Sequence, residues 1–366
     1  MSNGSSTRDS ENSALVVGAT GMAGGALCEQ LIRDGWTVYG LSLRPSERKG
    51  VVPITADLTA PASISVALAN LNPSHIFITA WIRMKSEAEN IRVNGGMVRD
   101  LLASVPNPSA VKHVALVTGL KHYVGPFEAY GTGAARDTPF HEDEPRLDVP
   151  NFYYAQEDEL WKASETHQFT WSVHRAHTML GFVVGNLMNM GLTLAVQAAL
   201  CRERGTAFRF PGNDVQWNAV TDMTEVGILA RQMIWAATTP EAANLAFNTA
   251  NGDLFRWRWM WPRLAELLGV EPAGYADQPE TLTANFDNDD SARDWRSLSA
   301  KHDLRVPDVT RLASWWHTDS DLNLPIEAFT DLTRSKRLGF LDHVVTVDAF
   351  GELFDRLRSE KIIPKL

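Results

Sequence analysis

The sequence is poor in cysteine, in positive charge and in long apolar runs, and each shortage excludes a class of protein. Its two cysteines, Cys28 and Cys201, are too few for a disulfide framework and lack the spacing of a metal site. A formal net charge of −10 argues against nucleic acids and anionic membranes as partners, because both attract basic surfaces. No apolar run reaches the roughly 18 residues that span a bilayer. We therefore expect a cytoplasmic protein with no metal, no nucleic acid and no membrane partner.

The length of the chain and the composition of its first residues predict how it is divided. Residues 1–13 are polar and lack the apolar core of a secretory signal, so we predict a disordered tail there. The 366 residues are too many for one compact core, and 44% of them are apolar. A large domain with a smaller one grafted onto it is the natural expectation.

Apolar strands alternate with helices through the first half of the sequence. The strand candidates are the runs ALVV, TVYGLSLR, VVPITADL, HIFITAW, VKHVALVTGL and FTWSVHRA. This alternation predicts an α/β fold of Rossmann type, in which helices cover both faces of a doubly wound parallel sheet. We expect the Rossmann domain over residues 14–180, with 213–250 returning to it. Residues 181–212 and 251–366 are expected to form a smaller, mainly helical substrate-binding or lid domain.

The segment GATGMAG is typical of a dinucleotide-binding turn. It places Gly18, Gly21 and Gly24 between the first strand and a helix. The first glycine permits a tight turn, the second lets the backbone approach a pyrophosphate, and the third lets the helix pack closely on the strand. Because the triplet lies inside a strand–helix–strand unit of about 30 residues, we interpret it as a cofactor site, with a plain glycine turn as the alternative. Thr20 and Met22 belong to the same predicted site.

The choice between NAD and NADP is expected at the end of the second strand, where a carboxylate would bind the ribose 2′-hydroxyl of NAD. Here Arg44 stands at the strand end, and no carboxylate precedes Glu47. A cation suits a 2′-phosphate, so the sequence predicts NADP(H) bound through Arg44; a solvated basic loop is the alternative. Asp57 and Leu58, after the third strand, are predicted to flank the adenine.

The tyrosine and lysine of ordinary short-chain dehydrogenases, spaced as Tyr-x-x-x-Lys, are not found together here. Four residues after Tyr153 stands Glu157, which cannot replace a lysine. Lys121, however, lies in the loop after the fifth strand, and such loops face the cofactor crevice in a doubly wound sheet. A helix beginning near Tyr153 would reach the same crevice. We therefore predict that the catalytic pair is built from two separate segments.

The segments TGLKHYVGPFE, NFYYAQED, FTWSVHR, FNTANGD and SKRLGFLDH together resemble the progesterone 5β-reductase / iridoid synthase family of atypical extended short-chain dehydrogenases. The resemblance runs from about residue 13 to the C-terminal KIIP. It implies NADPH-dependent reduction of the carbon–carbon double bond of enones and enals, with Lys121 and Tyr153 as catalytic residues and Thr118 near the cofactor. Hydride at the β-carbon leaves negative charge on the carbonyl oxygen, which a phenol and an ammonium would stabilise. The ammonium would also hold the tyrosine pKa down.

The resemblance also marks residues of the substrate pocket. Trp81, taken as the end of the fourth strand, matches a pocket tryptophan of the plant members, and a buried core position is the equal alternative. His122 and Tyr123 flank Lys121. They are predicted either to face the cavity or to fix the loop that carries the lysine.

Two histidines mark where this sequence departs from the family. Relatives carry Pro-Gly after the arginine of this motif, whereas this chain has Ala176 and His177. His317, in SWWH, aligns with an aromatic residue that caps the substrate in plant enzymes. We predict that both histidines line the substrate pocket and that the substrate is smaller or more polar than a steroid. For His317, a surface position beside two tryptophans is the alternative.

Three functions are compatible with these residues. The first is an ene-reductase that performs 1,4-reduction of enones or enals, and the second a carbonyl reductase that uses the same pair on a ketone or aldehyde. The third is a non-reducing, cyclase-like or regulatory NADP-binding protein, which the intact Lys121 and Tyr153 count against. We expect an oxidoreductase of the first kind, acting on a small carbonyl compound. The sequence leaves open the physiological substrate, the stereochemistry and whether the chain forms a homodimer.

Overall fold

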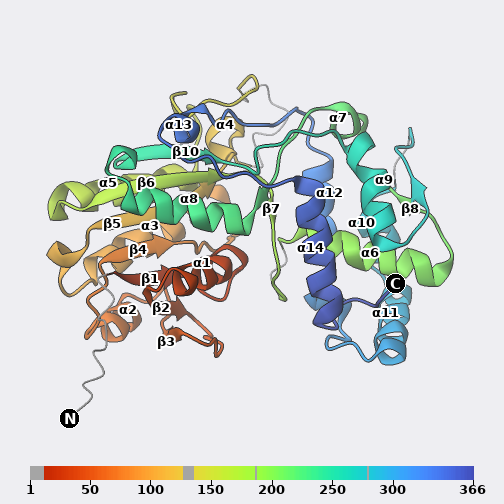
Figure 1. The fold of residues 1–366 in the computed structure, drawn as a ribbon, viewed down its shortest axis with the longest axis horizontal. Helices are drawn as coiled ribbons and strands as arrows, with labels where there is room; N and C mark the ends of the chain where they lie inside the picture. Colours follow the sequence, from red (N-terminus) through yellow and green to blue (C-terminus); the bar gives the residue numbers. More distant parts are fainter. Residues whose placement is uncertain (1–11, 127–135, 186–187, 278–279) are drawn as a thin grey trace, which may run out of the picture. The chain divides into compact units, whose positions relative to one another are not determined.

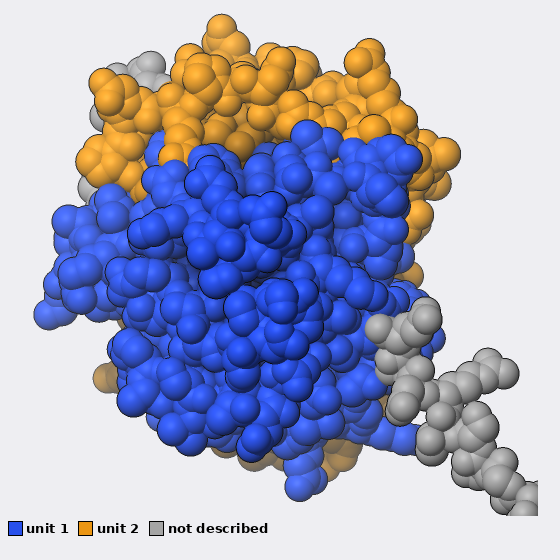
Figure 2. Space-filling view, turned by 90° about the vertical axis from the view of Figure 1, so that its left-hand side faces the viewer, with its two compact units in different colours: residues 1–117, 152–174, 230–246 blue, residues 118–151, 175–229, 247–366 orange. Residues whose placement is uncertain are grey.

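The computed structural model describes residues 12–126, 136–185, 188–277 and 280–366 (Figure 1). The chain divides into two compact units, which are distinguished in Figure 2. Unit 1 comprises Met1–Val117, Phe152–His174 and Ala230–Ala246, and unit 2 comprises Thr118–Asn151, Arg175–Leu229 and Phe247–Leu366. Of the tail predicted over residues 1–13, the first eleven lie outside the described residues, and Ser13 already belongs to the first strand.

A seven-stranded sheet is the main element of the fold. Its strands are β1 (Ser13–Val17), β2 (Thr37–Ser42), β3 (Val51–Thr55), β4 (His75–Ile78), β5 (His113–Gly119), β6 (Thr170–Ala176) and β10 (Leu245–Thr249). The strand order is β10-β6-β5-β4-β1-β2-β3, and the pairs from β3 through to β5 are all parallel. The order reverses between β1 and β4, as in a doubly wound Rossmann sheet. The predicted fold class is therefore confirmed.

Burial along the strands follows their place in the sheet. All four residues of β4 are buried, as are four of the five in β1. In β3, by contrast, no residue is fully buried, and this strand lies at the end of the sheet. Continuous apolar runs are needed where helices cover both faces of a strand, and an edge strand tolerates polar residues and Pro53. The difference in burial between β4 and β3 thus follows from their places in the sheet.

The helices of unit 1 position the segment that carries Tyr153. Two of them, α3 (Glu87–Ala103) and α5 (Phe152–His167), cross closely: a Cβ built on Gly95 would lie 3.3 Å from Cβ of Ala155. A Cβ there would be in tighter contact than most real Cβ atoms, so glycine suits this close approach. The other helices that lie mainly in unit 1 are α1 (Met22–Arg33), α2 (Pro61–Leu68), η1 (Pro108–Ala110), α8 (Val226–Thr238) and η3 (Pro240–Ala242).

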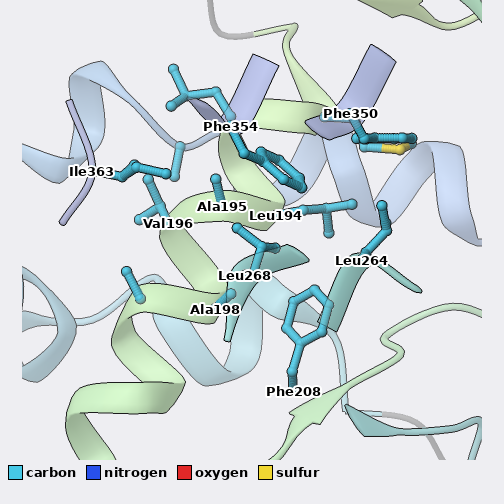
Figure 3. Packing of buried hydrophobic residues seen from close by; sticks show 14 of the residues in the cluster. Leu194, Ala195, Val196, Ala198, Phe208, Leu264, Leu268, Phe350, Phe354 and Ile363 are labelled. Carbon is cyan, nitrogen blue, oxygen red and sulfur yellow. The ribbon is translucent and has the colours of Figure 1, made fainter. Parts of the chain in front are cut away.

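Unit 2 is mainly helical and has an apolar core of its own. Figure 3 shows Leu194 of α6 (Met190–Arg204), Leu264 and Leu268 of α9 (Trp257–Leu268), and Phe350 and Phe354 of α14 (Thr346–Ser359) in this core. The remaining elements of unit 2 are α4 (Lys121–Val124), β7 (Met179–Leu180), β8 (Phe208–Arg209), α7 (Asp214–Asn218), β9 (Thr224–Glu225), β11 (Pro272–Ala273), α10 (Leu282–Phe286), α11 (Asp289–His302), η4 (Val309–Arg311), α12 (Trp315–Leu322) and α13 (Thr333–Arg337). The helical character predicted for the C-terminal region is confirmed.

Tryptophan has a structural role in this core. The ring of Trp261 is fully buried and stacks on Phe208, with ring centroids 4.2 Å apart. Its indole Nε1–H donates to the backbone carbonyl of Phe208 at 2.9 Å, so the one polar group of the side chain is satisfied. The ring thus joins α9 to the short strand β8.

A row of buried polar side chains runs along β5 and β6 in unit 1. His113 pairs through Nδ1 with Thr170 and through Nε2 with Ser172, both at 2.8 Å. Ser172 also pairs with Nε2 of His174 at 2.9 Å, and Nδ1 of His174 pairs with Gln232 at 2.8 Å. Burial lowers the pKa of His113 to about 3, helped by the charge that His174 would carry, and lowers the pKa of His174 to about 4. Both rings are therefore neutral in the folded protein near neutral pH.

We predict that the folded protein loses stability as the pH falls below about 6.5, the ordinary histidine value. His113 and His174 take up protons in the unfolded chain near that pH but in the folded chain only near pH 3 to 4, so the unfolded state binds more protons in between. Each histidine should cost about 2 kcal/mol of unfolding free energy between pH 7 and pH 5. His75, whose pKa burial also lowers to about 4, adds to the effect.

Urea denaturation at several pH values measures this dependence. His174→Gln should flatten the fall in unfolding free energy below pH 6.5, whereas His302→Asn, at an exposed position, should leave it unchanged. Equal unfolding free energies of the wild-type protein at pH 7 and pH 5 would contradict the prediction.

Candidate functional site

The glycine turn connects β1 to α1 in unit 1. Gly18 has a φ of +90°, which side chains other than glycine rarely adopt. A Cβ on Gly24 would lie 2.2 Å from the carbonyl oxygen of Gly18, so only glycine allows α1 to start this close to the strand. Gly21 is the N-cap residue of α1, and no side chain caps the helix there. The backbone N–H groups at the start of a helix bind phosphate well, so the turn fits a dinucleotide pyrophosphate.

Two neighbours of the glycines differ in exposure. Thr20 is exposed, so its hydroxyl and its backbone are both accessible to a ligand. The side chain of Met22 is buried in the core, which leaves its backbone N–H as the group that would face a phosphate. The two predicted ligand residues would therefore bind in different ways.

The basic loop after β2 contains two arginines, of which one is already paired and one is not. Arg48 donates to the carbonyl of Gly25 at 2.9 Å and to Glu29 at 2.7 Å, so its guanidinium is fixed against α1. Arg44 is exposed and has no hydrogen bond or ion pair with any residue that the structure describes. Of the two arginines, Arg44 thus has its charge uncommitted.

Asp57 closes a turn after β3. Its Oδ1 accepts hydrogen bonds from the backbone N–H and the hydroxyl of Thr59, at 2.8 and 2.7 Å. These bonds lower the pKa of Asp57, the hydroxyl contributing most, so the side chain is a carboxylate that can accept further bonds. Leu58 is partly buried and packs on the core of unit 1.

Trp81 does not end a strand, and this corrects the prediction. β4 ends at Ile78; Thr79 still bonds to the carbonyl of Val17 in β1, but the segment then leaves the sheet and is held by α3. The side chain of Asn94 on α3 accepts from the N–H of Ile82 at 2.8 Å and donates to its carbonyl at 2.9 Å. Trp81 itself is half-buried and stacks on Phe152, the first residue of α5, with centroids 5.1 Å apart.

The N-terminus of α5, which carries Tyr153, is capped by a residue that sequence reasoning missed. Oε1 of Glu87 accepts from the backbone N–H of Phe152 at 2.7 Å, and Oε2 accepts from Asn90 at 3.0 Å. A carboxylate at this end of a helix is favoured by the helix dipole. The segment SEAE does signal the start of α3, since Ser86 caps that helix. No local pattern, however, signals a bond to a residue 65 positions away.

The environment of Tyr153 reverses the expected direction of its pKa. Burial raises the pKa of the Tyr153 phenol, and the negative charge of Glu87 raises it further. A lysine was expected to lower it. The side chain is therefore a protonated phenol at neutral pH, which is the form that donates a hydrogen bond.

Lys121 lies in unit 2, two residues beyond the end of β5, and is the first residue of α4. It is buried, as is Thr118 near the end of β5. The carbonyl of Lys121 accepts from the side chain of Asn151 at 2.7 Å and from the N–H of Gly125 at 3.0 Å. Asn151 stands two residues before Tyr153 in the sequence. The backbone that carries the lysine is thus fixed to the residue preceding α5.

The two neighbours of Lys121 make contacts that hold this loop. The hydroxyl of Tyr123 donates to Asn248 at 2.6 Å and accepts from Arg175 at 3.0 Å, and the ring is fully buried. Burial raises the pKa of Tyr123 to about 12. His122 pairs with the carbonyl of Glu144 at 3.1 Å, and burial, followed by the charge of Arg175, lowers its pKa to about 3. These contacts fix the loop; a role in a substrate pocket stays a prediction for both residues.

His177 is anchored by a buried carboxylate in unit 2. Its Nδ1 lies 2.5 Å from Oδ1 of Asp222, a residue that is only 2% exposed. The other carboxylate oxygen of Asp222 accepts from the N–H and the hydroxyl of Thr330, at 2.9 and 2.6 Å. The carboxylate is thus held from two sides and fixes the orientation of the ring.

His317 lies on α12 and has a similar partner. Its Nδ1 is 3.5 Å from Oδ2 of Asp321, one helical turn further on. The side chain of His317 is 13% exposed, so it is not the surface histidine of the alternative interpretation. Burial raises the pKa of Asp321, against the opposing effects of His317 and His177. Neither Asp321 nor Thr330 was singled out from the sequence, because their roles depend on distant histidines.

A small cavity in unit 2 brings these groups together. Its polar lining consists of His177, Thr178, Gln216, Thr221, Asp222 and Asp321. The space available to the centre of a water molecule is about 10 Å³, which is room for about one water. Several hydrogen-bond donors and acceptors therefore line the cavity, and a water bound there could form hydrogen bonds with more than one of them.

Neither a metal-binding cluster nor a membrane-spanning helix occurs among the residues that the structure describes. Among those residues, no group of three or more histidine, cysteine, aspartate or glutamate side chains has the geometry to hold a metal ion. Over the same part of the chain, every helix is too short or too polar to span a bilayer.

The chain is similar to known proteins over nearly its whole length. The (S)-8-oxocitronellyl enol synthase of Camptotheca acuminata is 36% identical to it, over 98% of this chain and 94% of the synthase. The 3-oxo-Δ(4,5)-steroid 5-β-reductase of Arabidopsis thaliana is 35% identical, over 97% of this chain and 94% of the reductase. The resemblance to the progesterone 5β-reductase / iridoid synthase family is thereby confirmed.

Solved structures show the same fold at low sequence identity. UDP-glucose 4-epimerase of Thermotoga maritima matches with a TM-score of 0.67 at 17% identity, covering 95% of this chain and 99% of the epimerase. A short-chain dehydrogenase/reductase superfamily protein of Agrobacterium tumefaciens, solved with bound NAD, matches with a TM-score of 0.63 at 15% identity, covering 96% and 98%. The family described as a PRISE-like Rossmann-fold domain matches residues 55–364. The chain is a member of this PRISE-like Rossmann-fold family.

Proposed function

We propose that this oxidoreductase is an NADPH-dependent ene-reductase that reduces the carbon–carbon double bond of α,β-unsaturated ketones or aldehydes. The observation that carries the proposal is the relocated lysine. Lys121 begins α4 directly after β5, and no lysine stands four residues after Tyr153 on α5. Relatives named as an enol synthase and a steroid 5-β-reductase, at 36% and 35% identity, support the same class of reaction.

The cofactor would be held by the segments that follow the first three strands. The N-terminus of α1 and its glycine turn fit a pyrophosphate, and the exposed Arg44 suits a 2′-phosphate. Asp57 and Leu58 would flank the adenine, while Thr118 and Lys121 would lie toward the nicotinamide ribose. When bound, a nicotinamide cofactor supplies hydride. The Agrobacterium tumefaciens protein with the same fold, which was solved with NAD, supports this class of cofactor.

The chain's own residues would stabilise the charge that hydride addition creates. Hydride at the β-carbon of an enone leaves an enolate, whose negative charge is concentrated on the carbonyl oxygen. The phenol of Tyr153 is protonated, because burial raises its pKa, and can donate a hydrogen bond to that oxygen. The ammonium of Lys121 would add an electrostatic contribution. Together they would lower the barrier without an immediate proton transfer to oxygen.

Substrate recognition is assigned to residues 181–212 and 251–366, with help from Trp81, His122, Tyr123 and His177. The histidine–aspartate pairs of unit 2 make part of this region polar. A polar pocket favours an enone smaller or more oxygenated than a steroid. The protein would work in the cytoplasm, where its buried, unpaired cysteines would stay reduced.

The cofactor assignment predicts that NADPH binds more tightly than NADH. Arg44→Asp should weaken NADPH binding by roughly 10- to 100-fold, since a charged hydrogen bond contributes about 1.5 to 3 kcal/mol, and should favour NADH. Lys49→Asp, at an exposed position in the same loop, makes the same charge change and should have a smaller effect. The measurement is cofactor titration by fluorescence. Equal affinity of the wild-type protein for both cofactors would contradict the assignment.

The catalytic assignment predicts different losses for the two residues. Lys121→Ala should lower turnover and also raise the KM for NADPH, because a lysine in this loop would contact the ribose as well as the enolate. Tyr153→Phe should lower kcat by roughly 100-fold, the usual loss for one oxyanion donor, and leave measurable enone reduction. Tyr154→Phe is the matched control, since Tyr154 is a buried neighbour on the same helix. A larger loss for Tyr154→Phe than for Tyr153→Phe would show that the wrong tyrosine is assigned.

The reaction itself is tested with 2-cyclohexen-1-one and cyclohexanone as separate substrates. We expect NADPH consumption with the enone only, and cyclohexanone as its product, because the charge-stabilising groups would meet a carbonyl two carbons beyond the carbon that receives hydride. Product identification by gas chromatography decides the matter. An allylic alcohol, with the double bond intact, would reject ene-reduction and identify a carbonyl reductase.

A further inference from the structure

His177 stands where a Rossmann fold places its reactive groups. It is the first residue after β6, and Lys121 stands two residues after β5, the neighbouring strand in the sheet. In doubly wound folds, ligands bind in the crevice outside the carboxyl ends of the strands. Both residues belong to unit 2. His177 thus follows the end of its strand as closely in the sequence as the proposed catalytic lysine follows the end of β5.

The ring of His177 is held in a fixed orientation, as the rings of acid–base histidines are. The 2.5 Å contact between Nδ1 and Asp222 fixes which nitrogen carries the bound proton and which way the ring faces. Asp222 cannot turn away, since Thr330 holds its second oxygen with two hydrogen bonds. In proton-transfer enzymes, a buried group often holds one nitrogen of a histidine so that the other nitrogen faces the reacting molecule.

The second ring nitrogen of His177 is left for another partner. Among the residues that the structure describes, nothing forms a hydrogen bond with Nε2. The side chain is only 9% exposed, so bulk water does not surround it. His177 does line the cavity that has room for about one water molecule. A ring nitrogen in such a place is suited to exchange a proton with a bound molecule.

The charged groups that face the ring are mostly acidic. Asp222 and Asp321 line the same cavity as His177, and His317 lies beside Asp321. A neighbouring cavity, on which Asp222 also borders, is lined by Asp253, Asp331 and Lys336. The ring therefore shares its cavity with two acidic side chains.

We propose that His177 is the proton donor that completes the reduction. This rests on the enone reduction proposed above, with hydride and its electron pair coming from the nicotinamide cofactor. The imidazolium would give its Nε2 proton to the α-carbon of the enolate: the C–H bond forms as the N–H bond breaks, and the carbonyl is restored. The neutral ring then takes one proton from solvent. One hydride and one proton are consumed per double bond, and Asp222 serves as a positioning residue.

The reverse of this step can be measured without hydride transfer. With NADP⁺ bound and cyclohexanone in D₂O, neutral His177 should remove an α-proton, and deuterium should enter the ketone, as followed by ¹H NMR. His177→Asn should slow the exchange by roughly 100-fold, the usual contribution of a general base. His302→Asn, at an exposed position, should exchange at the wild-type rate. Equal exchange rates for wild type and His177→Asn would overturn the proposal.

The stereochemistry of the forward reaction gives a second measurement. Reduction of 2-methyl-2-cyclohexen-1-one creates a stereocentre at the α-carbon, so the wild-type enzyme should give one enantiomer in excess. His177→Asn should still oxidise NADPH but give a nearly racemic product, because solvent would protonate the released enolate from either side. An unchanged enantiomeric excess with His177→Asn would reject His177 as the donor while leaving the enone reductase intact. Failure of the wild-type enzyme to consume NADPH with either enone would reject both proposals.

The role of Asp222 is tested by the same measurement of enantiomeric excess. Asp222→Asn should lower the enantiomeric excess, a readout that a purely structural role would not change. Since loss of Asp222 also removes the partner of Thr330, this variant could unfold. Thr330→Val is the milder variant: it removes one of the two donors that hold the carboxylate and should lower the excess by less. A full wild-type excess in both folded variants would overturn the positioning role.

Discussion

The parallel sheet is the constraint on which the candidate site depends. Parallel strands need crossover connections, so each strand's carboxyl end is followed by a loop that is free to carry function. Gly18 follows β1, Lys121 follows β5 and His177 follows β6, each within two residues of the strand end. The sheet does not choose the residues, but it fixes the places from which they start. Ordinary short-chain dehydrogenases carry the lysine on the same helix as the tyrosine. A lysine on the loop after β5 is compatible with the constraint, because that loop starts at the carboxyl end of a strand.

Buried polar contacts between distant segments then fix these loops. The side chain of Asn151 holds the carbonyl of Lys121, and Glu87 holds the N-terminus of α5. Leaving a buried donor or acceptor without its partner costs about 1 to 3 kcal/mol, so each of these bonds opposes movement of its loop. The candidate residues therefore owe their positions to side chains that have no chemical role of their own.

The same physical effect, burial, has opposite consequences for different groups. It keeps the phenol of Tyr153 protonated and thus able to donate, and it keeps His122 neutral. His177 differs because a carboxylate lies against its ring. That carboxyl group fixes the orientation of the ring. The chemistry of each titratable side chain thus depends on its partners as much as on its identity.

The sequence by itself determined the fold class, the glycine turn and the family. Strand periodicity, the spacing of Gly18, Gly21 and Gly24, and the motif around Lys121 are local patterns, and local patterns can be read directly from a chain. The sequence failed for Trp81: the strand predicted to end at that residue ends at Ile78, and Asn94 holds the backbone of the segment at Ile82. The side chain that holds the backbone of this loop belongs to a helix further along the chain, so no periodicity within the strand revealed it.

Only the tertiary structure decided the state and the partners of the titratable residues. The raised pKa of Tyr153 depends on burial and on Glu87, which lies 65 residues before the segment it caps. The orientation of His177 depends on Asp222, 45 residues away, and that of Asp222 on Thr330, a further 108 residues along the chain. A sequence shows which residues are present, but desolvation and hydrogen bonding depend on what the folded chain places around them.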